Sequence, residues 1–251
     1  MKRVLVWWFG AFAIVIAVWH LSLSMRFVSP AAVAYPHEVA LALPRLLTPS
    51  GGLADVVSTM TRSLLAFAIS VPIGLTAGVL IFYSGNARYP AQFFVDFLRS
   101  IPATALVPFF LILYGVGDTT KIAVGVFSSG LVICLATVSG LCGRNTTRQT
   151  IARILKLTGV RRVCLVDIPE AAPQIFLGFR TGISLALILV VVSEMLIGSN
   201  RGIGKVIADM RYTDDMPRLY AAMVMAGIIG YLYNLALAAS ERWLLHWRGA
   251  P

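Results

Sequence analysis

Charged residues are scarce in this sequence. Lys, Arg, Asp and Glu make up 13% of its 251 residues, against about 25% in soluble globular proteins. Hydrophobic residues make up 58%, which leaves too few polar side chains to cover an ordinary soluble domain. The composition therefore indicates a membrane protein.

Residues that bind metals or nucleotides, or that act as nucleophiles, are also scarce. The three histidines are scattered and form neither an HExxH motif nor a triad with a nucleophile. The three cysteines match no metal-ligand spacing, and no GxxxxGKS or GxxxxGKT phosphate loop occurs. We therefore expect no catalytic residue, no metal site and no cofactor bound by this chain.

Long apolar runs dominate what is present. Several approach the roughly 20 residues that a helix needs to cross a bilayer, and helices satisfy their own backbone hydrogen bonds in lipid. We expect an all-α fold, a polytopic membrane helix bundle with one domain over residues 1–251. The third span is the weakest, because it is short and contains Pro108. The predicted spans are 4–24, 63–83, 101–116, 120–142, 172–197 and 219–240.

The first apolar run has two explanations. Lys2 and Arg3 precede it, as in a signal peptide, and residues 32–34 (Ala-Val-Ala) resemble a cleavage site. The run of about 20 residues is longer than the usual signal core, however, and the candidate cleavage site lies well beyond its end. A membrane span is therefore the preferred interpretation.

The distribution of Lys and Arg orients the chain. If the N-terminus is cytoplasmic, the cytoplasmic segments carry more Lys and Arg than the outer segments. Because basic loops are retained in the cytoplasm, we expect both termini on that side. Topology thereby explains the net charge of +10. No soluble basic domain is present that would bind nucleic acid, so we expect no nucleic-acid partner.

Glycine pairs occur in two of the predicted spans. Gly74 and Gly78 lie four residues apart in the second span, and Gly178 and Gly182 lie four apart in the fifth. Small residues at this spacing let helices approach closely. The pairs predict a packed bundle and carry no information about a solute.

A basic insert, here called the elbow (residues 144–168), separates the fourth and fifth spans. Apolar residues recur at the spacing of one helix face from Ile151 to Thr158, and Gly159 then permits a turn. Pro169 suits the first turn of the fifth span. A helix-turn-helix that docks a cytoplasmic partner and a basic helix that lies on anionic lipid both explain this segment. Its basic residues are Arg144, Arg148, Arg153, Lys156, Arg161 and Arg162.

The elbow resembles the cytoplasmic signature loop of ABC-importer permeases. That loop begins Glu-Ala-Ala, has a Gly a few residues later and ends hydrophobic-x-Leu-Pro. A gapless frame anchored on Pro169 places residues 150–152 (Thr-Ile-Ala) at Glu-Ala-Ala and Lys156 at the Gly, so that the Glu and the Gly are both missing. A second frame, anchored on Gly159, requires three deleted residues, and the gapless frame is preferred.

Further motifs are similar to the nitrate, sulfonate and taurine branch of these permeases. They are Phe-Leu-Arg-Ser-Ile-Pro at 97–102, Gly-Phe-Arg-Thr-Gly-Ile at 178–183 and Ser-Glu-Met-Leu-Ile-Gly at 193–198. The resemblance covers about residues 55–245. It implies a permease of the bacterial inner membrane that moves a small anionic solute by alternating access. The branch also handles thiamine-precursor and riboflavin-like substrates, so a vitamin precursor stays an alternative.

The resemblance also implies partners. A separate cytoplasmic ATPase dimer would bind ATP and Mg²⁺, and each elbow would dock in a groove on it as a coupling helix. A second, identical permease subunit would complete the pathway, a periplasmic or lipid-anchored solute-binding protein would deliver the solute, and lipid would surround the bundle. The implied coupling residues are Thr150, Ile151, Ala152, Arg153, Leu155, Lys156, Thr158, Gly159, Arg161 and Arg162.

Polar residues inside the spans are the candidate pathway residues. On the fifth span Ser184 lies about 40° to one side of Arg180 and Glu194 about 40° to the other, which makes a stripe about 20 Å long. This stripe either lines a pathway, where Arg180 meets an anionic solute, or Arg180 reaches the interface and Glu194 pairs with a neighbour. Ser128 and Ser139 share a face of the fourth span and either join helices or contact solute.

Two other functional classes fit less well. A stand-alone channel or secondary transporter is disfavoured because the spans are poor in acidic residues and the sequence shows no internal repeat. A membrane enzyme would need a cluster of nucleophile, base or metal ligands, which the sequence does not supply. We therefore expect a transport subunit rather than an enzyme.

Overall fold

The computed structural model describes residues 2–27, 29, 32–143 and 146–246 of the chain. The described residues form helices and no strand, which confirms the predicted all-α class. The helices belong to two compact units. Unit 1 comprises residues 1–59 and 198–228, and unit 2 comprises residues 60–197 and 229–251.

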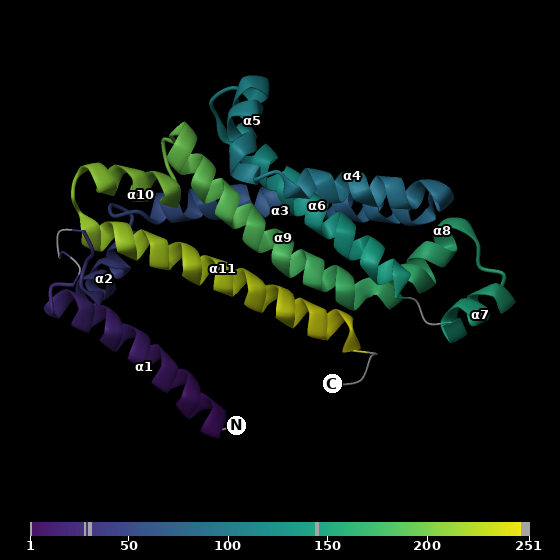
Figure 1. The fold of residues 1–251 in the computed structure, drawn as a ribbon, viewed down its shortest axis with the longest axis horizontal. Helices are drawn as coiled ribbons and strands as arrows, with labels where there is room; N and C mark the ends of the chain where they lie inside the picture. Colours follow the sequence, from purple (N-terminus) through teal and green to yellow (C-terminus); the bar gives the residue numbers. More distant parts are fainter. Residues whose placement is uncertain (1, 28, 30–31, 144–145, 247–251) are drawn as a thin grey trace. The chain divides into compact units, whose positions relative to one another are not determined.

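Unit 1 contains the N-terminal helix and several short helices (Figure 1). Two side chains at the start of α3 (Leu53–Tyr83) cap the N-terminus of α10 (Ile203–Tyr212). Asp55 Oδ1 accepts a hydrogen bond from the Gly202 amide, and Thr59 Oγ1 accepts one from the Ile203 amide, each at 2.8 Å. They satisfy donors that the first turn of a helix leaves unpaired. The elements are α1 (Lys2–Ser24), α2 (Pro36–Ala42), the 3-10 helix η1 (Pro44–Leu47), the first turns of α3 (Leu53–Tyr83), α10 (Ile203–Tyr212) and the first part of α11 (Met216–Leu244).

Unit 2 is built around α6 (Asp118–Cys142) and α9 (Ile168–Ile197), which pack against each other extensively. Glycines allow the close approach. A Cβ atom added at Gly74 or Gly78 of α3 would lie within 2.7 Å of side chains on α6, and one added at Gly178 or Gly182 of α9 would also press on α6. The predicted role of both glycine pairs in helix packing is therefore confirmed.

The predicted third span, 101–116, is not one helix. The 3-10 helix η2 (Gly85–Ala87) leads into α4 (Arg88–Ser100), and the 3-10 helix η3 (Ala103–Leu106) leads into α5 (Val107–Tyr114), with a bend of 83° between the two pairs. Ile101 is extended, with φ −73° and ψ 125°, because a residue before proline disfavours the α conformation.

The prediction that Pro108 interrupts this span is also wrong. Pro108 lies in the first turn of α5, where its missing amide costs no hydrogen bond. The break lies earlier, at Pro102, and α4 supplies the first half of the bent pair.

Among the described residues, four helices are long and apolar enough to cross a membrane, and the bent pair would make a fifth span. The four long helices contain the predicted spans 63–83, 120–142, 172–197 and 219–240. In α1 the apolar helix with described side chains is Ala13–Ser24, which is too short for the same test. The predicted count of six is therefore not confirmed. The four helices are Leu53–Tyr83, Asp118–Cys142, Gly159–Ile197 and Met216–Leu244.

Candidate functional site

The elbow lies at the end of unit 2 where α6 ends and α9 begins (Figure 1). It consists of α7 (Thr146–Ile154), α8 (Gly159–Arg162) and a π-helical turn, η4 (Val163–Asp167). Arg144, which the sequence placed in the elbow, is outside the described residues.

Pro169 lies in the first turn of α9, as the sequence predicted, but the helical path begins further upstream. The helix runs without a break from Gly159 to Ile197, over 39 residues. A proline ring inside a helix clashes with the carbonyl group four residues earlier. The wider π-helical turn immediately before Pro169 relieves that clash, so the helix continues through the proline.

Lys156 ends α7 in a left-handed conformation, with φ +52°. The Leu157 amide donates to the Ala152 carbonyl and the Lys156 amide donates to the Arg153 carbonyl, each at 3.0 Å. This is the hydrogen-bond pattern of a Schellman cap, whose left-handed position is usually Gly. In the gapless frame Lys156 stands where the signature loop has its Gly. Gly159, which takes that place in the second frame, is also left-handed with φ +55°, so the backbone geometry is compatible with both frames.

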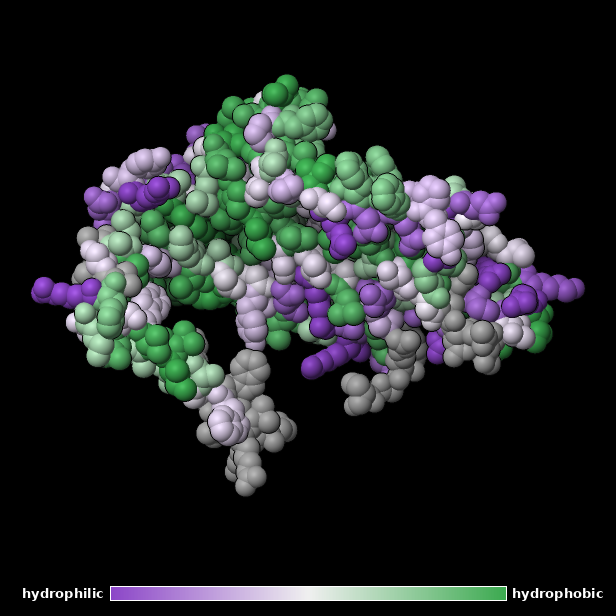
Figure 2. All heavy atoms as spheres, in the orientation of Figure 1, coloured by the Kyte–Doolittle hydropathy of each residue, from purple (hydrophilic) through white to green (hydrophobic). Residues whose placement is uncertain are grey.

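The apolar stripe of α7 faces outward. The exposed fractions of Ile151, Ile154 and Leu155 are 50%, 73% and 64%. Figure 2 shows hydrophilic residues gathered at this end of unit 2, whereas hydrophobic residues cover α5. The outward-facing side chains of the elbow therefore combine apolar surface with positive charge. The exposed members of the predicted coupling set are Thr150, Ile151, Arg153, Leu155, Lys156, Thr158, Gly159 and Arg161.

Two predicted coupling residues do not lie on this surface. Ala152 is 1% exposed and lies on the inner side of α7. Arg162 turns inward, where its side chain is 28% exposed and its Nε lies 3.6 Å from Asp167. The helix rotation and an internal ion pair turn these two inward, whereas the other eight are exposed. The coupling role of the ten residues stays a prediction.

Beneath the elbow, five polar side chains form a network, here called the clasp (Tyr83, Gln149, Arg162, Asp167 and Glu170). Gln149 Nε2 donates to Asp167 at 3.1 Å and to Glu170 at 3.3 Å. Tyr83 donates to Asp167, and Arg162 donates to Gln149. Asp167 is completely buried, so its charge depends on these partners.

The clasp joins α7 to the end of α3 and to the start of α9. Displacing α7 would leave buried polar groups unpaired, and such groups are costly. The elbow and α9 should therefore move together. Sequence reasoning missed Tyr83, Gln149 and Glu170, and the signal that could have found them is the pair of acids flanking Pro169 beside a basic helix.

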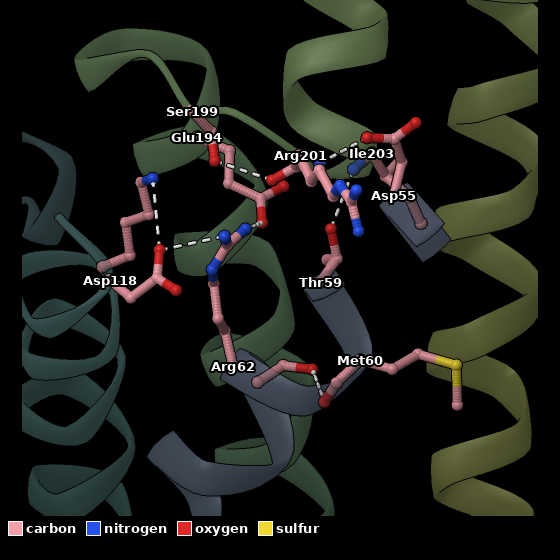
Figure 3. Close-up of polar contacts among 12 residues, drawn as sticks. Asp55, Thr59, Met60, Arg62, Asp118, Glu194, Ser199, Arg201 and Ile203 are labelled. Carbon is pink, nitrogen blue, oxygen red and sulfur yellow. Dashed lines mark hydrogen bonds and ion pairs between the residues drawn. The ribbon is translucent and has the colours of Figure 1, made fainter. Parts of the chain in front are cut away.

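A second charge cluster, most of whose members are buried, lies near the other end of α9 (Figure 3). Arg62 Nη1 of α3 lies 2.6 Å from Glu194 Oε1, and Arg62 Nη2 lies 2.9 Å from Asp118 Oδ1 of α6. Lys121 Nζ lies 3.7 Å from the same Asp118 oxygen. Glu194 is completely buried and Arg62 is 7% exposed. The structure thus places Glu194 in an ion pair with Arg62, and the two ion pairs of Arg62 connect α3, α6 and α9.

The other candidate pathway residues are not brought together. Arg180 pairs with Glu241 of α11, and Ser184 accepts a hydrogen bond from Asn234 of α11 at 2.9 Å. Both contacts lie within unit 2. Sequence reasoning did not identify these two partners, which are 61 and 50 residues away.

The two serines of α6 have different surroundings. Ser128 is 8% exposed and lines a pocket beside the end of α4. Ser139 is exposed near the C-terminal end of α6. Their common helix face therefore does not form one continuous lining.

Metal-ligating side chains are not clustered in the part of the chain that the structure describes. No three His, Cys, Asp or Glu residues there are arranged to hold a metal ion. In the described elbow, apolar and basic groups face outward and paired charges lie inside.

Comparison with known proteins shows that the chain matches one protein family. Residues 70–247 match the family described as "Binding-protein-dependent transport system inner membrane component". The chain is 26% identical over 238 residues to the putative aliphatic sulfonates transport permease protein SsuC of Bacillus subtilis (strain 168), covering 95% of this chain and 86% of that protein. It is 26% identical over 248 residues to the taurine transport system permease protein TauC of Escherichia coli (strain K12), covering 96% and 89%.

A solved structure is similar in fold. The inward-facing MetNI methionine ABC transporter aligns with a TM-score of 0.69 and 19% identity, covering 76% of this chain and 95% of the solved chain. At this identity the similarity supports the helix arrangement and carries no information about the solute.

Proposed function

Because the chain belongs to the family of binding-protein-dependent transport system inner membrane components, it is a permease of an ABC importer, and we propose that its solute is an aliphatic sulfonate or a similarly small organic anion. The sulfonate and taurine permeases named above support this solute class, since each aligns with 95% or more of the chain. The nitrate-like solutes of the same branch are part of the proposal.

The outward-facing elbow carries the proposal for the mechanism. Its apolar side chains are exposed beside Arg153, Lys156 and Arg161, and exposed apolar groups ringed by charge are typical of interaction sites. We propose that the elbow docks in a groove of a cytoplasmic ATPase dimer. ATP and Mg²⁺ would be bound by that ATPase, and this chain would contribute the coupling contact.

The clasp would transmit the motion. Gln149 of α7 and Asp167 at the base of α9 are joined by a buried hydrogen bond, so a displacement of the elbow would pull on α9. Asp167 and Glu194 are 27 residues apart on one continuous helix, which is about 40 Å. ATPase closure at the elbow would thereby reach the Arg62–Glu194 cluster by rigid movement of α9.

The remaining partners follow from the same assignment. We propose a second, identical permease subunit, a periplasmic or lipid-anchored solute-binding protein at the outer face, and cytoplasmic termini in a bacterial inner membrane. In the described part of the chain, four apolar helices, or five spans with the bent pair, support a multi-pass protein surrounded by lipid.

A charge reversal (Arg153→Glu) and a bulky substitution (Thr158→Trp) on the elbow test the docking role. We expect Arg153→Glu, and Thr158→Trp separately, to lower ATPase co-purification and ATP-driven uptake of butane-1-sulfonate into proteoliposomes by about tenfold. This corresponds to about 1.4 kcal/mol of lost binding. Membrane insertion should be unchanged, because both side chains are exposed.

Arg242→Glu is the matched control, since Arg242 is an exposed arginine of α11 outside the elbow. It should leave co-purification and uptake near those of the unmodified chain. Full transport by both elbow variants would contradict the docking role. Uptake of a thiamine precursor in place of sulfonates would keep the importer and change the solute.

A further inference from the structure

A pocket of about 520 Å³ lies within unit 2, between the end of α4, the helix break at Pro102, α6 and α9. Its size suits a small organic molecule. Its walls are mostly apolar, and hydroxyl groups and one charged side chain also line it. The apolar lining includes Leu98, Ile101, Phe127, Leu131, Val132 and Leu185.

Ser128 has an unusual environment in this pocket. It is 8% exposed, and its hydroxyl makes no hydrogen bond to another residue that the structure describes. Its neighbour Ser129 donates to the Gly125 carbonyl at 2.5 Å, and Thr137 donates to the Ile133 carbonyl at 2.8 Å. The Ser128 hydroxyl is not used in this way and is not among the fully buried polar atoms, so it is available to a molecule in the pocket.

Arg99 is the charged residue of the lining. Its described ion pair is with Asp96 at 3.4 Å, and both side chains are more than half exposed. Such surface pairs are weak, so the guanidinium can turn to another anion. A guanidinium presents two parallel N–H groups to an oxyanion and binds it through both.

The other hydroxyls of the pocket are already used as donors. Ser100 donates to the Asp96 carbonyl at 2.9 Å, and Thr181 donates to the Leu177 carbonyl at 3.0 Å. Arg99 and Ser128 are therefore the donors that a bound oxyanion would find. The apolar wall formed by Leu131, Val132 and Leu185 lies in the same pocket and suits a short carbon chain.

We propose that this pocket is a binding site for the transported solute, in which Arg99 and Ser128 hold an oxyanion head and the apolar wall covers its carbon chain. The inference rests on the proposed function, because it deepens the assignment of a small organic anion. It assigns specificity to two side chains that lie on different helices.

A cysteine reporter tests the charge preference of the pocket without assuming a solute. Ser128→Cys is made in the full chain with Cys134, Cys142 and Cys164 replaced by Ala, and the protein is held in lipid nanodiscs. The modification rate is measured with an anionic reagent, 2-sulfonatoethyl methanethiosulfonate, and with the cationic 2-(trimethylammonio)ethyl methanethiosulfonate. We expect the ratio of anionic to cationic rate to fall by about tenfold when Arg99→Gln is added.

Arg242→Gln is the control and should leave the ratio unchanged, because Arg242 lies outside the pocket lining. A ratio that Arg99→Gln does not alter would overturn the inference.

Protection experiments separate the pocket from the solute assignment. Butane-1-sulfonate should slow labelling of the cysteine at 128, whereas butan-1-ol at the same concentration should not. If butane-1-sulfonate is transported but gives no protection, the inference is wrong and the proposed function stands. If the charge preference holds while butane-1-sulfonate is neither protective nor transported, the anion site stands and the sulfonate assignment is wrong.

Discussion

Glu194 and Asp167 are carboxylates with no exposed surface in a chain that is poor in acids. Each has an arginine as partner, Arg62 for Glu194 and Arg162 for Asp167. An isolated buried charge is strongly unfavourable, and breaking a buried pair costs more than the pair contributes. These two acids should therefore be sensitive positions, one for stability and one for coupling.

Neutralising Glu194 should destabilise the protein. We expect Glu194→Gln to lower the free energy of unfolding by about 3 kcal/mol, because Arg62 loses a partner at 2.6 Å in a buried position. Denaturant unfolding of the detergent-solubilised protein measures this change.

Asp118 provides the internal comparison for this cluster. Its side chain is 60% exposed, so Asp118→Asn should cost less than about 1 kcal/mol. The double variant Arg62→Leu with Glu194→Leu should recover most of the loss, since it removes both buried charges. Equal effects of Glu194→Gln and Asp118→Asn would show that burial does not set the strength of these contacts.

The elbow is short, and its shape depends on how α7 ends. Three hydrogen bonds close the helix end, from the amides of Leu155, Lys156 and Leu157 to carbonyl groups of α7. The left-handed conformation at Lys156 costs about 1 kcal/mol for a residue with a side chain. The end of α7 thus holds a left-handed position although the residue there is lysine and not glycine.

Replacing Lys156 by Gly should stabilise the end of α7. We expect Lys156→Gly to increase the protection of the Leu157 amide against hydrogen exchange by about fivefold, which corresponds to about 1 kcal/mol. Lys156→Ala is the matched control, because it removes the same charge and keeps the left-handed strain. If both variants gave equal protection, the cap would not depend on backbone strain.

The continuous helix from Gly159 to Ile197 determines whether its two ends lie on the same side of the membrane or on opposite sides. Its 39 residues span about 58 Å, well beyond the roughly 30 Å of a bilayer core. The clasp lies at one end of this helix and the Arg62–Glu194 cluster near the other. A helix of this length that crosses a membrane once has its two ends on opposite sides.

Cysteine labelling tests which side each end occupies. We expect Thr158→Cys, in a chain otherwise lacking cysteine, to react with a membrane-impermeant maleimide only after the cells are permeabilised. Asn200→Cys, an exposed position beyond the other end of the helix, should react in spheroplasts without permeabilisation. Labelling at position 158 from outside would place the elbow on the wrong side and contradict ATPase docking.

Hydropathy and glycine spacing were enough to predict much of this architecture. The spans at 63–83, 120–142, 172–197 and 219–240 lie within continuous helices, because lipid forces any long apolar run to satisfy its backbone internally. The glycine pairs were also recognisable, since close helix packing leaves no room for a Cβ atom. The bent pair around Pro102 was not predicted, because a proline can start a helix or end one and the context decides.

The pairing of the polar residues is what the local sequence could not specify. Arg62 and Glu194 are 132 residues apart, and which side chains meet depends on how each helix is rotated and how far it slides against its neighbours. The same rotation turned Ala152 and Arg162 inward and left Ile154 exposed. Composition and periodicity are properties of each segment and therefore identified a helical membrane protein with a basic elbow, whereas the resemblance of its motifs to a known family indicated a permease. Ion pairs, the clasp and the Ser128 pocket are properties of packed helices, so they emerged only from the three-dimensional arrangement.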